Sequence, residues 1–263
     1  MDPGIYIFCL SNTQCPDFPG SSCELDRLFL HRHGNLCAIA KRVSLEEFCG
    51  PEADRRLADP AWVTPRAIDH GRVIAEVFRS SPVLPVPFGT LFSSPRVLED
   101  FLERNANLIE GFFEYAADCE EWGIKALLER STAHKWLRAQ IAVACASSGA
   151  PASAGLRYIQ QRQSEAAAEK QLQHWLLGAC ESIARSLDDC ASDRRQRAIL
   201  DPAIPDDSRE LVLNLAALIP RERREDLFAH IENSNAERAE QGLSFVLNGP
   251  WPPYSFYPPL VTP

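Results

Sequence analysis

Methionine is almost absent from this sequence of 263 residues, and its single copy is Met1. The core therefore lacks the flexible thioethers that fill irregular gaps between side chains. Long apolar runs are missing too, since no stretch approaches the roughly twenty residues of a membrane span. The apolar run at residues 5–10 is too short for a signal peptide, and Asp2 precedes it in place of a basic region. We therefore expect a cytoplasmic protein without a membrane segment.

An excess of basic residues is also missing. The formal net charge is −9, whereas proteins that bind nucleic acid usually carry a basic stripe. The densest basic stretches, residues 194–197 and 221–224, lie among carboxylates in predicted helices, and such runs are typical of solvated helix faces. Neither nucleic acid nor an anionic membrane is expected as a partner.

Familiar catalytic motifs do not occur. The sequence contains no G-x-S-x-G, P-loop, G-x-G-x-x-G or H-E-x-x-H motif. Its nine cysteines form no C-x-x-C pair, so reduced and partly buried thiols are the simplest interpretation. Cys9, Cys15 and Cys23 are close enough in sequence to leave a redox pair open. We predict no catalytic residue and no cofactor, and a thiol-dependent enzyme with an unrecognised cleft remains the alternative function.

Histidines offer two weak signals. His31 and His33 lie on one side of a predicted strand end with Cys37 nearby, but a structural zinc site needs four ligands and no fitting set is visible. A surface hairpin is the preferred interpretation, and we predict no metal site. His70 lies on the apolar face of a predicted helix, where a histidine that hydrogen-bonds the backbone is more common than a general base.

Hydrophobic periodicity divides the first half into strands and two helices. Thr64 resembles an N-cap with Pro65 at the first helical position, and Ser94 with Pro95 repeats that pattern. Prolines at 82, 85 and 87 exclude a central strand, so residues 82–90 are predicted as extended chain at a sheet edge or under a helix. The expected elements are strands at 5–10, 27–31 and 36–41 and helices at 64–79 and 95–117.

A change in composition near residue 118 marks the predicted domain boundary. Trp122, Ile124, Ala126 and Leu128 alternate, which predicts a strand with one buried face. The pattern then predicts helices at 131–145 and 153–198, a central strand at 210–219, a helix from 220 to 242 and a last strand from 243. The two helices that follow the first strand form a long αα-hairpin that projects from the domain. The prediction is an α+β chain with two α/β domains, at residues 1–117 and 118–263.

The C-terminal stretch LNGPWPPYSF, residues 247–256, combines prolines with aromatic residues. A ligand of SH3 domains is an open polyproline II segment that usually carries a basic residue, and no Lys or Arg follows Arg238. We therefore expect residues 251–256 to pack back on the protein.

Three motifs in this order resemble the gas vesicle protein L/F family. GPWPPYSF at 249–256 resembles the C-terminal signature of that family, VLPVPFGTLFSS at 83–94 its central L-P-x-x-F-G-T motif, and EWGIKALLER at 121–130 its E-(W/V)-x-x-K strand. Together with a tyrosine in the first strand they span nearly the whole chain. The cysteine-rich stretch from Cys9 to Cys23 has no assigned counterpart, and the L or F subtype stays open.

The resemblance implies an accessory protein of gas vesicle formation, the process that builds gas-filled shells for buoyancy. It implies a second domain of modified ferredoxin-like fold with a helical hairpin, and binding to the shell protein or to other gas vesicle accessory proteins, with a location in the cytoplasm or on the vesicle. Contact zones are expected at the proline-punctuated segment, the hairpin face and the tail. The candidate residues are Leu84, Pro85, Phe88, Gly89, Thr90, Trp122, Lys125, Trp175, Leu176, Gly249, Pro250, Trp251, Pro252, Pro253, Tyr254 and Phe256.

Overall fold

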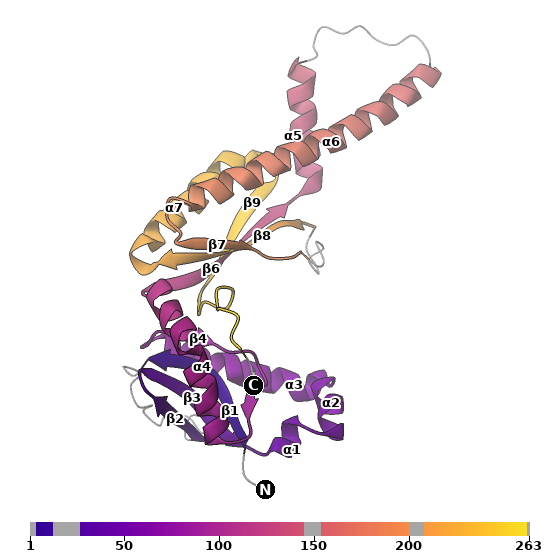
Figure 1. Cartoon of the computed structure of the whole chain (residues 1–263). Coiled ribbons are helices and arrows are strands. Elements are labelled where there is room, and N and C mark those ends of the chain that lie inside the picture. The colour runs from indigo at the N-terminus through magenta and orange to yellow at the C-terminus, as the bar shows by residue number, and fades with distance from the viewer. Residues whose placement is uncertain (1–3, 13–26, 145–153, 200–207, 262–263) are drawn as a thin grey trace. The chain divides into compact units, whose positions relative to one another are not determined.

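The computed structural model describes residues 4–12, 27–144, 154–199 and 208–261 (Figure 1). The chain forms two compact units, which are described separately. Unit 1 comprises Met1–Glu121 together with Pro250–Pro263, and unit 2 comprises Trp122–Gly249. Residues 250–263 thus group with the first unit, whereas the sequence pattern had assigned them to a domain that starts at residue 118.

The first unit contains a five-stranded sheet with strand order β2-β3-β1-β4, and β5 also pairs with β1. All the pairings around β1 and β3 are antiparallel, and a bulge between Ile7 and Cys9 shifts the β1–β3 register. The three predicted strands are confirmed, and the proline segment lies at the sheet edge as expected. The strands are β1 (Gly4–Asn12), β2 (Leu28–His33), β3 (Leu36–Val43), β4 (Leu84–Pro85) and β5 (Leu91–Phe92).

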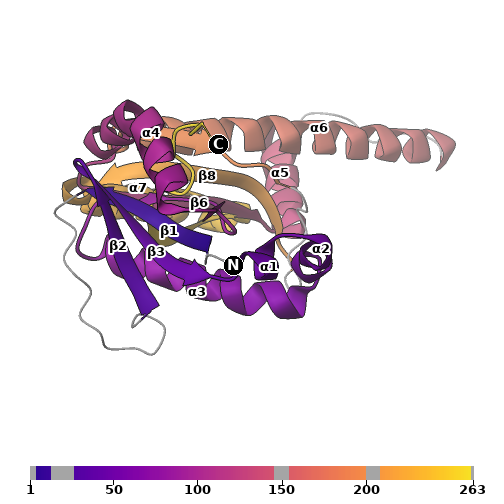
Figure 2. The same cartoon turned by 60° about the horizontal axis from the view of Figure 1, so that its bottom comes forward.

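Two long helices cover this sheet on opposite faces (Figure 2). They are α3 (Pro60–Phe78) and α4 (Pro95–Tyr115), and the short helices α1 (Leu45–Phe48) and α2 (Pro51–Leu57) precede them. The Ser94 hydroxyl accepts a hydrogen bond from Val97 N, so the predicted cap of α4 is confirmed. The predicted start of α3 at Thr64 is wrong. Asp59 is the cap instead, because its carboxylate accepts from Ala61 N at 3.0 Å and Pro60 occupies the first helical turn.

The second unit contains a four-stranded sheet with order β7-β8-β6-β9. Along the chain, a strand is followed by two helices, two strands, one helix and one strand. The strands are β6 (Cys119–Leu128), β7 (Asp193–Gln196), β8 (Glu210–Pro220) and β9 (Leu243–Trp251). The helices are α5 (Arg130–Ala144), α6 (Ala154–Leu187) and α7 (Arg224–Arg238), with short 3-10 turns at Arg221–Arg223 and Ala239–Gln241.

One face of this sheet and the three helices build the core of the second unit. Alternate residues of β6, β8 and β9 pack against buried residues of α5, α6 and α7. Figure 1 shows α6 crossing the sheet. The prediction that β6 has a single buried face is wrong, because Glu121, Gly123 and Leu127 on the alternate face are buried as well. Other parts of the chain cover this alternate face: side-chain atoms of Asn248 and Arg197 would lie 3.5 and 3.6 Å from a Cβ atom at Gly123, and Glu121 accepts from Ser255 N.

The helix predicted to reach residue 198 ends at Leu187. Asp188 and Asp189 follow, and carboxylates are unfavourable at the negative end of the helix dipole. Ser192 N then donates to Leu218 O of β8 at 2.8 Å, and this bond leads into β7. Because β7 is a polar and mostly exposed edge strand, its sequence DRRQ shows no hydrophobic alternation that could reveal it.

Candidate functional site

The proline-punctuated segment docks on β1 through its backbone. Val86 N donates to Phe8 O at 3.3 Å, and Ile7 N donates to Thr90 O at 3.1 Å. Between these bonds, Thr90 N and the Thr90 hydroxyl both donate to Pro87 O, at 3.2 and 2.6 Å, and close a four-residue turn. Gly89 is the third residue of this turn and has φ +86°, a conformation that other residues adopt at a cost. The turn therefore explains why glycine stands beside Phe88 in the motif.

This turn places Phe88 in an aromatic cluster on the α3 side of the sheet. Its ring centroid lies 6.2 Å from that of Tyr6 and 5.8 Å from that of His70, both nearly edge to face. The imidazole of His70 also stacks on Phe8, with 5.5 Å between ring centroids. Such offset and edge-to-face pairs add to the stabilisation that burial itself provides.

A chain of hydrogen bonds fixes His70 within this cluster. His70 Nε2 lies 3.1 Å from Val86 O, and Nδ1 lies 2.7 Å from the Tyr6 hydroxyl. Burial lowers the pKa of His70, although the bond to Val86 opposes that shift, so the neutral ring is favoured. In the neutral tautomer Nε2–H donates to the carbonyl, and Nδ1 accepts from the Tyr6 hydroxyl. Burial also raises the pKa of Tyr6, which keeps that donor protonated. The prediction that backbone contacts satisfy His70 is confirmed.

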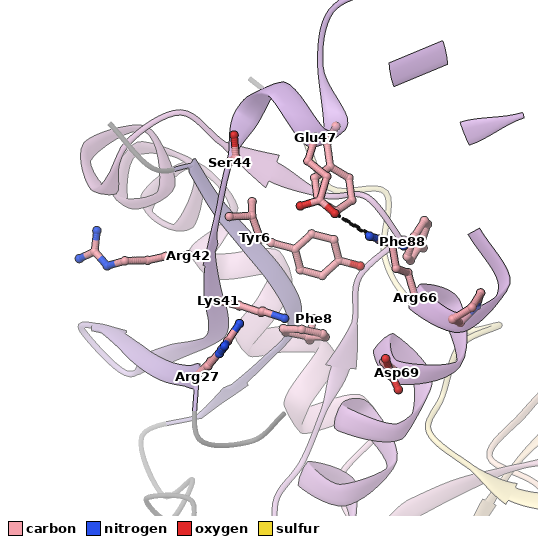
Figure 3. A pocket seen from close by; sticks show the side chains of 13 residues that line it. Tyr6, Phe8, Arg27, Lys41, Arg42, Ser44, Glu47, Arg66, Asp69 and Phe88 are labelled. Carbon is pink, nitrogen blue, oxygen red and sulfur yellow. Dashed lines mark hydrogen bonds and ion pairs between the residues drawn. The ribbon is translucent and has the colours of Figure 1, made fainter. Parts of the chain in front are cut away.

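An open hollow with a volume of about 490 Å³ adjoins these aromatic residues (Figure 3). We call it the aromatic hollow. Four aromatic rings line it, together with charged residues from β3, α1 and α3 and with Arg27, which directly precedes β2. Its lining residues are Tyr6, Phe8, Arg27, Lys41, Arg42, Val43, Ser44, Glu47, Phe48, Pro65, Arg66, Asp69 and Phe88.

Ion pairs stiffen one wall of the aromatic hollow. Arg66 Nη2 and Nε both donate to the same Glu47 oxygen, at 2.8 and 3.2 Å, and its guanidinium lies 4.0 Å from the ring centroid of Trp62. Asp69 accepts from Arg72 on the next turn of α3 at 3.2 Å. Both carboxylates of the hollow thus already accept from an arginine.

The C-terminal tail, residues 250–261, is held to the first unit by two buried polar side chains. Glu121 is fully buried and accepts from Ser255 N at 2.7 Å and from the Ser255 hydroxyl at 3.0 Å. Asn105, also fully buried, accepts from Val261 N at 2.8 Å and donates to Val261 O at 3.0 Å. An isolated buried carboxylate or amide is costly, so these bonds hold the tail in one register.

The tail buries some of its residues and exposes others. Phe256 is 2% exposed, and Pro252 and Pro253 are buried, so the expected packing is confirmed for them. Trp251 and Tyr254 are 46% and 38% exposed, and the packing predicted for these two residues is wrong. The reason is spacing: with buried residues at 252, 253 and 256, the side chains of Trp251, Tyr254 and Tyr257 lie on the opposite side of the tail. Burial together with the nearby Cys9 and Glu121 raises the pKa of the Tyr254 hydroxyl to about 12.

Several candidate residues lie in the second unit and are described within it. Trp122 is buried against the ring of Phe228, at 5.3 Å between centroids, and belongs to the core. Trp175 packs on Trp136 at 5.4 Å, and Leu176 and Lys125 are half-buried. A role for these residues in partner binding remains a prediction.

The structure also places the thiols and imidazoles that sequence analysis considered. Burial raises the pKa of Cys180 and Cys190, the opposite of the shift that activates a thiol nucleophile. Cys15 and Cys23 lie outside the described residues. His31 and His33 lie 3.3 Å from Glu99 and Glu103 respectively. Within the described residues, no group of three or more metal-ligating side chains comes together.

Sequence reasoning missed the residues that hold these features in place. Asn105 and Glu121 looked like ordinary positions of a helix and a strand, and their partners are 156 and 134 residues away. The pairing of Arg66 with Glu47, 19 residues apart, was equally hidden. A weak signal existed for Asn105, because it interrupts the otherwise apolar face of α4, whereas Glu121 shares its face of β6 with Lys125 and gave no such signal.

Comparison with known proteins places the chain in context. The family model described as "Gas vesicle synthesis protein GvpL/GvpF" matches residues 4–258. A protein named "Gas vesicle protein L" from Streptomyces sp. (strain CB03234) is 25% identical over 227 residues, which cover 86% of this chain and 82% of that protein.

Two crystal structures share the fold. Gas vesicle protein GvpF from Anabaena sp. PCC7120 has a TM-score of 0.67 at 14% identity, over 97% of this chain and 98% of that one. GvpF from Microcystis aeruginosa has a TM-score of 0.63 at 14% identity, over 97% and 99%. In the described part of this chain, no helix has both the length and the apolar character that crossing a bilayer requires.

Proposed function

The chain belongs to the gas vesicle synthesis protein GvpL/GvpF family, and on this premise we propose that it is an accessory protein of gas vesicle formation that acts by binding another polypeptide. Its partner is the gas vesicle shell protein or another gas vesicle accessory protein. A shell protein that is not yet assembled exposes apolar surface and is prone to aggregate, so covering that surface is a reasonable task for an accessory protein in the cytoplasm or on the vesicle.

The observation that carries this proposal is the C-terminal tail. Its backbone is fixed by Glu121 and Asn105, and Phe256 is buried, yet Trp251 and Tyr257 remain 46% and 43% exposed. Binding hot spots are enriched in Trp and Tyr, and an ordered segment loses little conformational entropy when a partner binds. A fixed row of exposed aromatic side chains therefore suits recognition of an apolar polypeptide.

The fold of the second unit is part of the proposal. We infer that it is a modified ferredoxin-like domain, in which α5 and α6 take the place of the first helix as a projecting hairpin. The chain order β-αα-β-β-α-β and the strand order β7-β8-β6-β9 support this inference. We also infer that each unit is a domain, since buried residues cluster separately within each of them.

Co-purification tests the proposed function directly. The full chain is expressed with each gas vesicle protein of its host in turn, and the partner retained on the tagged chain is quantified. Trp251→Ala is expected to weaken retention at least about tenfold, because truncating a hot-spot tryptophan removes a large contact area. Tyr115→Ala, which changes a side chain 41% exposed on α4, is the matched control and should retain the partner.

A third variant separates binding from folding. Phe256→Ala removes a buried ring and should lower the free energy of unfolding by about 3–5 kcal/mol, whereas Trp251→Ala should leave the thermal midpoint nearly unchanged. The proposal fails if no gas vesicle protein is retained. It also fails if Trp251→Ala and Tyr115→Ala reduce retention equally.

A further inference from the structure

We infer that the outer edge of β9 is a second binding site, which takes an uncharged, extended apolar segment of another polypeptide as a further strand of the sheet. We call this site the β9 edge and define it as the outward side of residues 243–249, all of which belong to the second unit. That the segment belongs to a gas vesicle protein rests on the proposed function.

β9 has a neighbouring strand on one side only. In the strand order β7-β8-β6-β9 it pairs with β6, and no strand of the described residues lies on its other side. Successive residues of a strand direct their N–H and C=O groups to opposite sides, so an edge strand presents a row of unpaired groups. The β9 edge is therefore a place where another strand can be added.

Two sets of hydrogen bonds identify the groups that face outward. Gly242 O, immediately before β9, accepts from Glu129 N at 2.7 Å, so the even-numbered residues that follow it face β6. Phe245 bonds on the opposite side: its N–H donates to Asn235 Oδ1 of α7 at 2.7 Å, and its C=O accepts from Asn235 Nδ2 at 3.0 Å. The odd-numbered residues of β9 thus face outward.

The bond to Asn235 shows what the β9 edge accepts. A side-chain amide that both donates to and accepts from one residue reproduces the pair of bonds that a neighbouring strand makes. In the described part of the chain, the outward N–H and C=O groups of the next two odd-numbered residues, Leu247 and Gly249, make no such bond. Gly249 is exposed, and because it has no side chain this exposure is that of its backbone.

The two edges of this sheet differ in their protection against further pairing. β7, the opposite edge, has four residues with the sequence DRRQ, three of them charged. Short edge strands and charged side chains are common means of preventing unwanted strand pairing. β9 has nine residues, and its segment LSFVLNG at 243–249 contains neither a charge nor a proline. The β9 edge therefore lacks the features that prevent pairing.

The side chains of β9 determine the chemistry of the partner. Val246 is 42% exposed on one face, and Leu247 is half-buried on the other, where it packs against the core of the second unit. An added strand would place a side chain beside each of them, and apolar cross-strand pairs are favourable. A charged residue there would lose hydration without gaining a counter-charge from residues 243–249. The partner segment is therefore uncharged and apolar at two successive positions.

Fluorescence anisotropy with the full chain tests this inference. The probe is a fluorescein-labelled peptide, Gly-Ser-Thr-Val-Val-Thr-Ser-Gly, and its matched control carries N-methyl groups on both valines. N-methylation removes the central donors from both edges of the peptide but leaves it uncharged and slightly more apolar. The unmodified peptide is expected to bind at least about tenfold more tightly, because the methylated one cannot complete the ladder.

A third peptide tests the requirement for an uncharged segment. It carries glutamate in place of both valines, and it should bind at least about tenfold more weakly than the probe. The comparison is made at high salt, where repulsion by the formal net charge of −9 is screened.

Two variants at one position then locate the peptide on β9. Leu247→Pro removes the outward N–H and leaves the bonds to β6 in place, and edge strands accept proline where the N–H faces solvent. Leu247→Ala also loses side-chain packing but keeps the N–H. The proline variant should weaken binding at least about tenfold, whereas the alanine variant should weaken it only about twofold to threefold.

Hydrogen exchange gives a readout that needs no variant. In the free chain the amides of Leu247 and Gly249 should exchange rapidly, whereas those of Val246 and Asn248, which face β6, should be protected. A saturating concentration of the probe peptide should slow exchange at Leu247 and Gly249.

Other outcomes overturn the inference. Equal binding of the unmodified and N-methylated peptides would leave only an apolar surface, and equal losses in Leu247→Pro and Leu247→Ala would place the peptide elsewhere. Slow exchange of Leu247 and Gly249 in the free chain would show that the β9 edge is already covered, by a second copy of this chain if the protection disappears on dilution. These readouts do not depend on any gas vesicle protein, so the inference can fail while the proposed function holds, and the reverse.

Discussion

At the scale of single residues, His70 shows how a buried ionisable group makes the stability of this protein depend on pH. The imidazole is 6% exposed and bridges Val86 O and the Tyr6 hydroxyl. Burial lowers its pKa in the folded state. The unfolded chain therefore binds a proton at a higher pH than the folded chain does, and stability falls as the pH decreases below about 6.5, the ordinary histidine value.

His70→Gln should remove this dependence. At pH 7.5 the variant is expected to lose about 1–2 kcal/mol of unfolding free energy, because two buried hydrogen bonds are weakened. As the pH falls from 7 to 5, the wild type should lose stability faster than the variant, so that the difference between them narrows. Thermal unfolding of both proteins at several pH values measures this difference in stability. His174→Gln, a change at an exposed position of α6, is the control, and a difference that widens on acidification would contradict the prediction.

How much of the site could be predicted varies from residue to residue. The position of His70 on an apolar helix face was enough to predict a structural role, because the helical period alone determines which side chains point inward. The turn at Phe88 and Gly89 was visible as a motif, but its partner Tyr6 was not. That contact joins residues 83 positions apart, and neither periodicity nor composition carries information over such a separation.

At the scale of elements, the connection between the 3-10 turn Ala239–Gln241 and β9 depends on one glycine, Gly242. Gly242 has φ +72°, and a Cβ atom there would lie 2.8 Å from Glu129 O and 2.9 Å from Thr132 Cβ. Its own carbonyl accepts from Glu129 N at 2.7 Å, so the backbone at this point cannot move away without losing that bond. The glycine thus fixes where β9 begins relative to α5.

Gly242→Ala should therefore lower the free energy of unfolding by roughly 2–4 kcal/mol, from the left-handed backbone and from overpacking. Gly178→Ala is the matched control in the same unit, since no atom lies within 4 Å of its added Cβ, and it should stabilise α6 by about 0.5–1 kcal/mol. Urea denaturation followed by tryptophan fluorescence measures both. An unchanged midpoint for Gly242→Ala would show that the contact with Glu129 relaxes.

Elements with a strong hydrophobic period were predictable, and the others were not. The start of α4 at Ser94 and Pro95 combined a cap with a clear apolar face. The start of α3 was predicted wrongly because Asp59-Pro60 and Thr64-Pro65 both resemble an N-cap followed by proline. Only the hydrogen bond from Ala61 N to the Asp59 carboxylate identifies Asp59 as the cap. The edge strand β7 lacks apolar residues, so its register is set by pairing with β8 and not by a pattern of its own.

At the scale of the whole molecule, the chain leaves the first unit at Glu121 and returns to it at Pro250. The second unit is therefore an insertion into the first. The sequence indicated an α+β chain with two parts, but it assigned the tail to the second of them. The bonds that decide this, from Ser255 to Glu121 and from Val261 to Asn105, join distant positions and could not be predicted from local patterns.

Deletion of residues 250–263 tests this division. The truncation leaves the buried Glu121 and Asn105 without their tail partners and exposes the surface under Phe256, so the first unit should lose stability. Hydrogen exchange followed by mass spectrometry should show faster exchange in residues 4–121 and unchanged protection in residues 122–249. Faster exchange confined to the second unit would contradict the assignment of the tail.

The insertion also imposes an order on biosynthesis. Translation proceeds from the N-terminus, so all of Trp122–Gly249 is made before the ribosome reaches the segment that closes the first unit. Nascent domains generally fold as units while they are being synthesised. The unit that begins first is consequently the one that matures last, and a ribosome that stalls before residue 250 leaves a folded insert attached to an unfinished host.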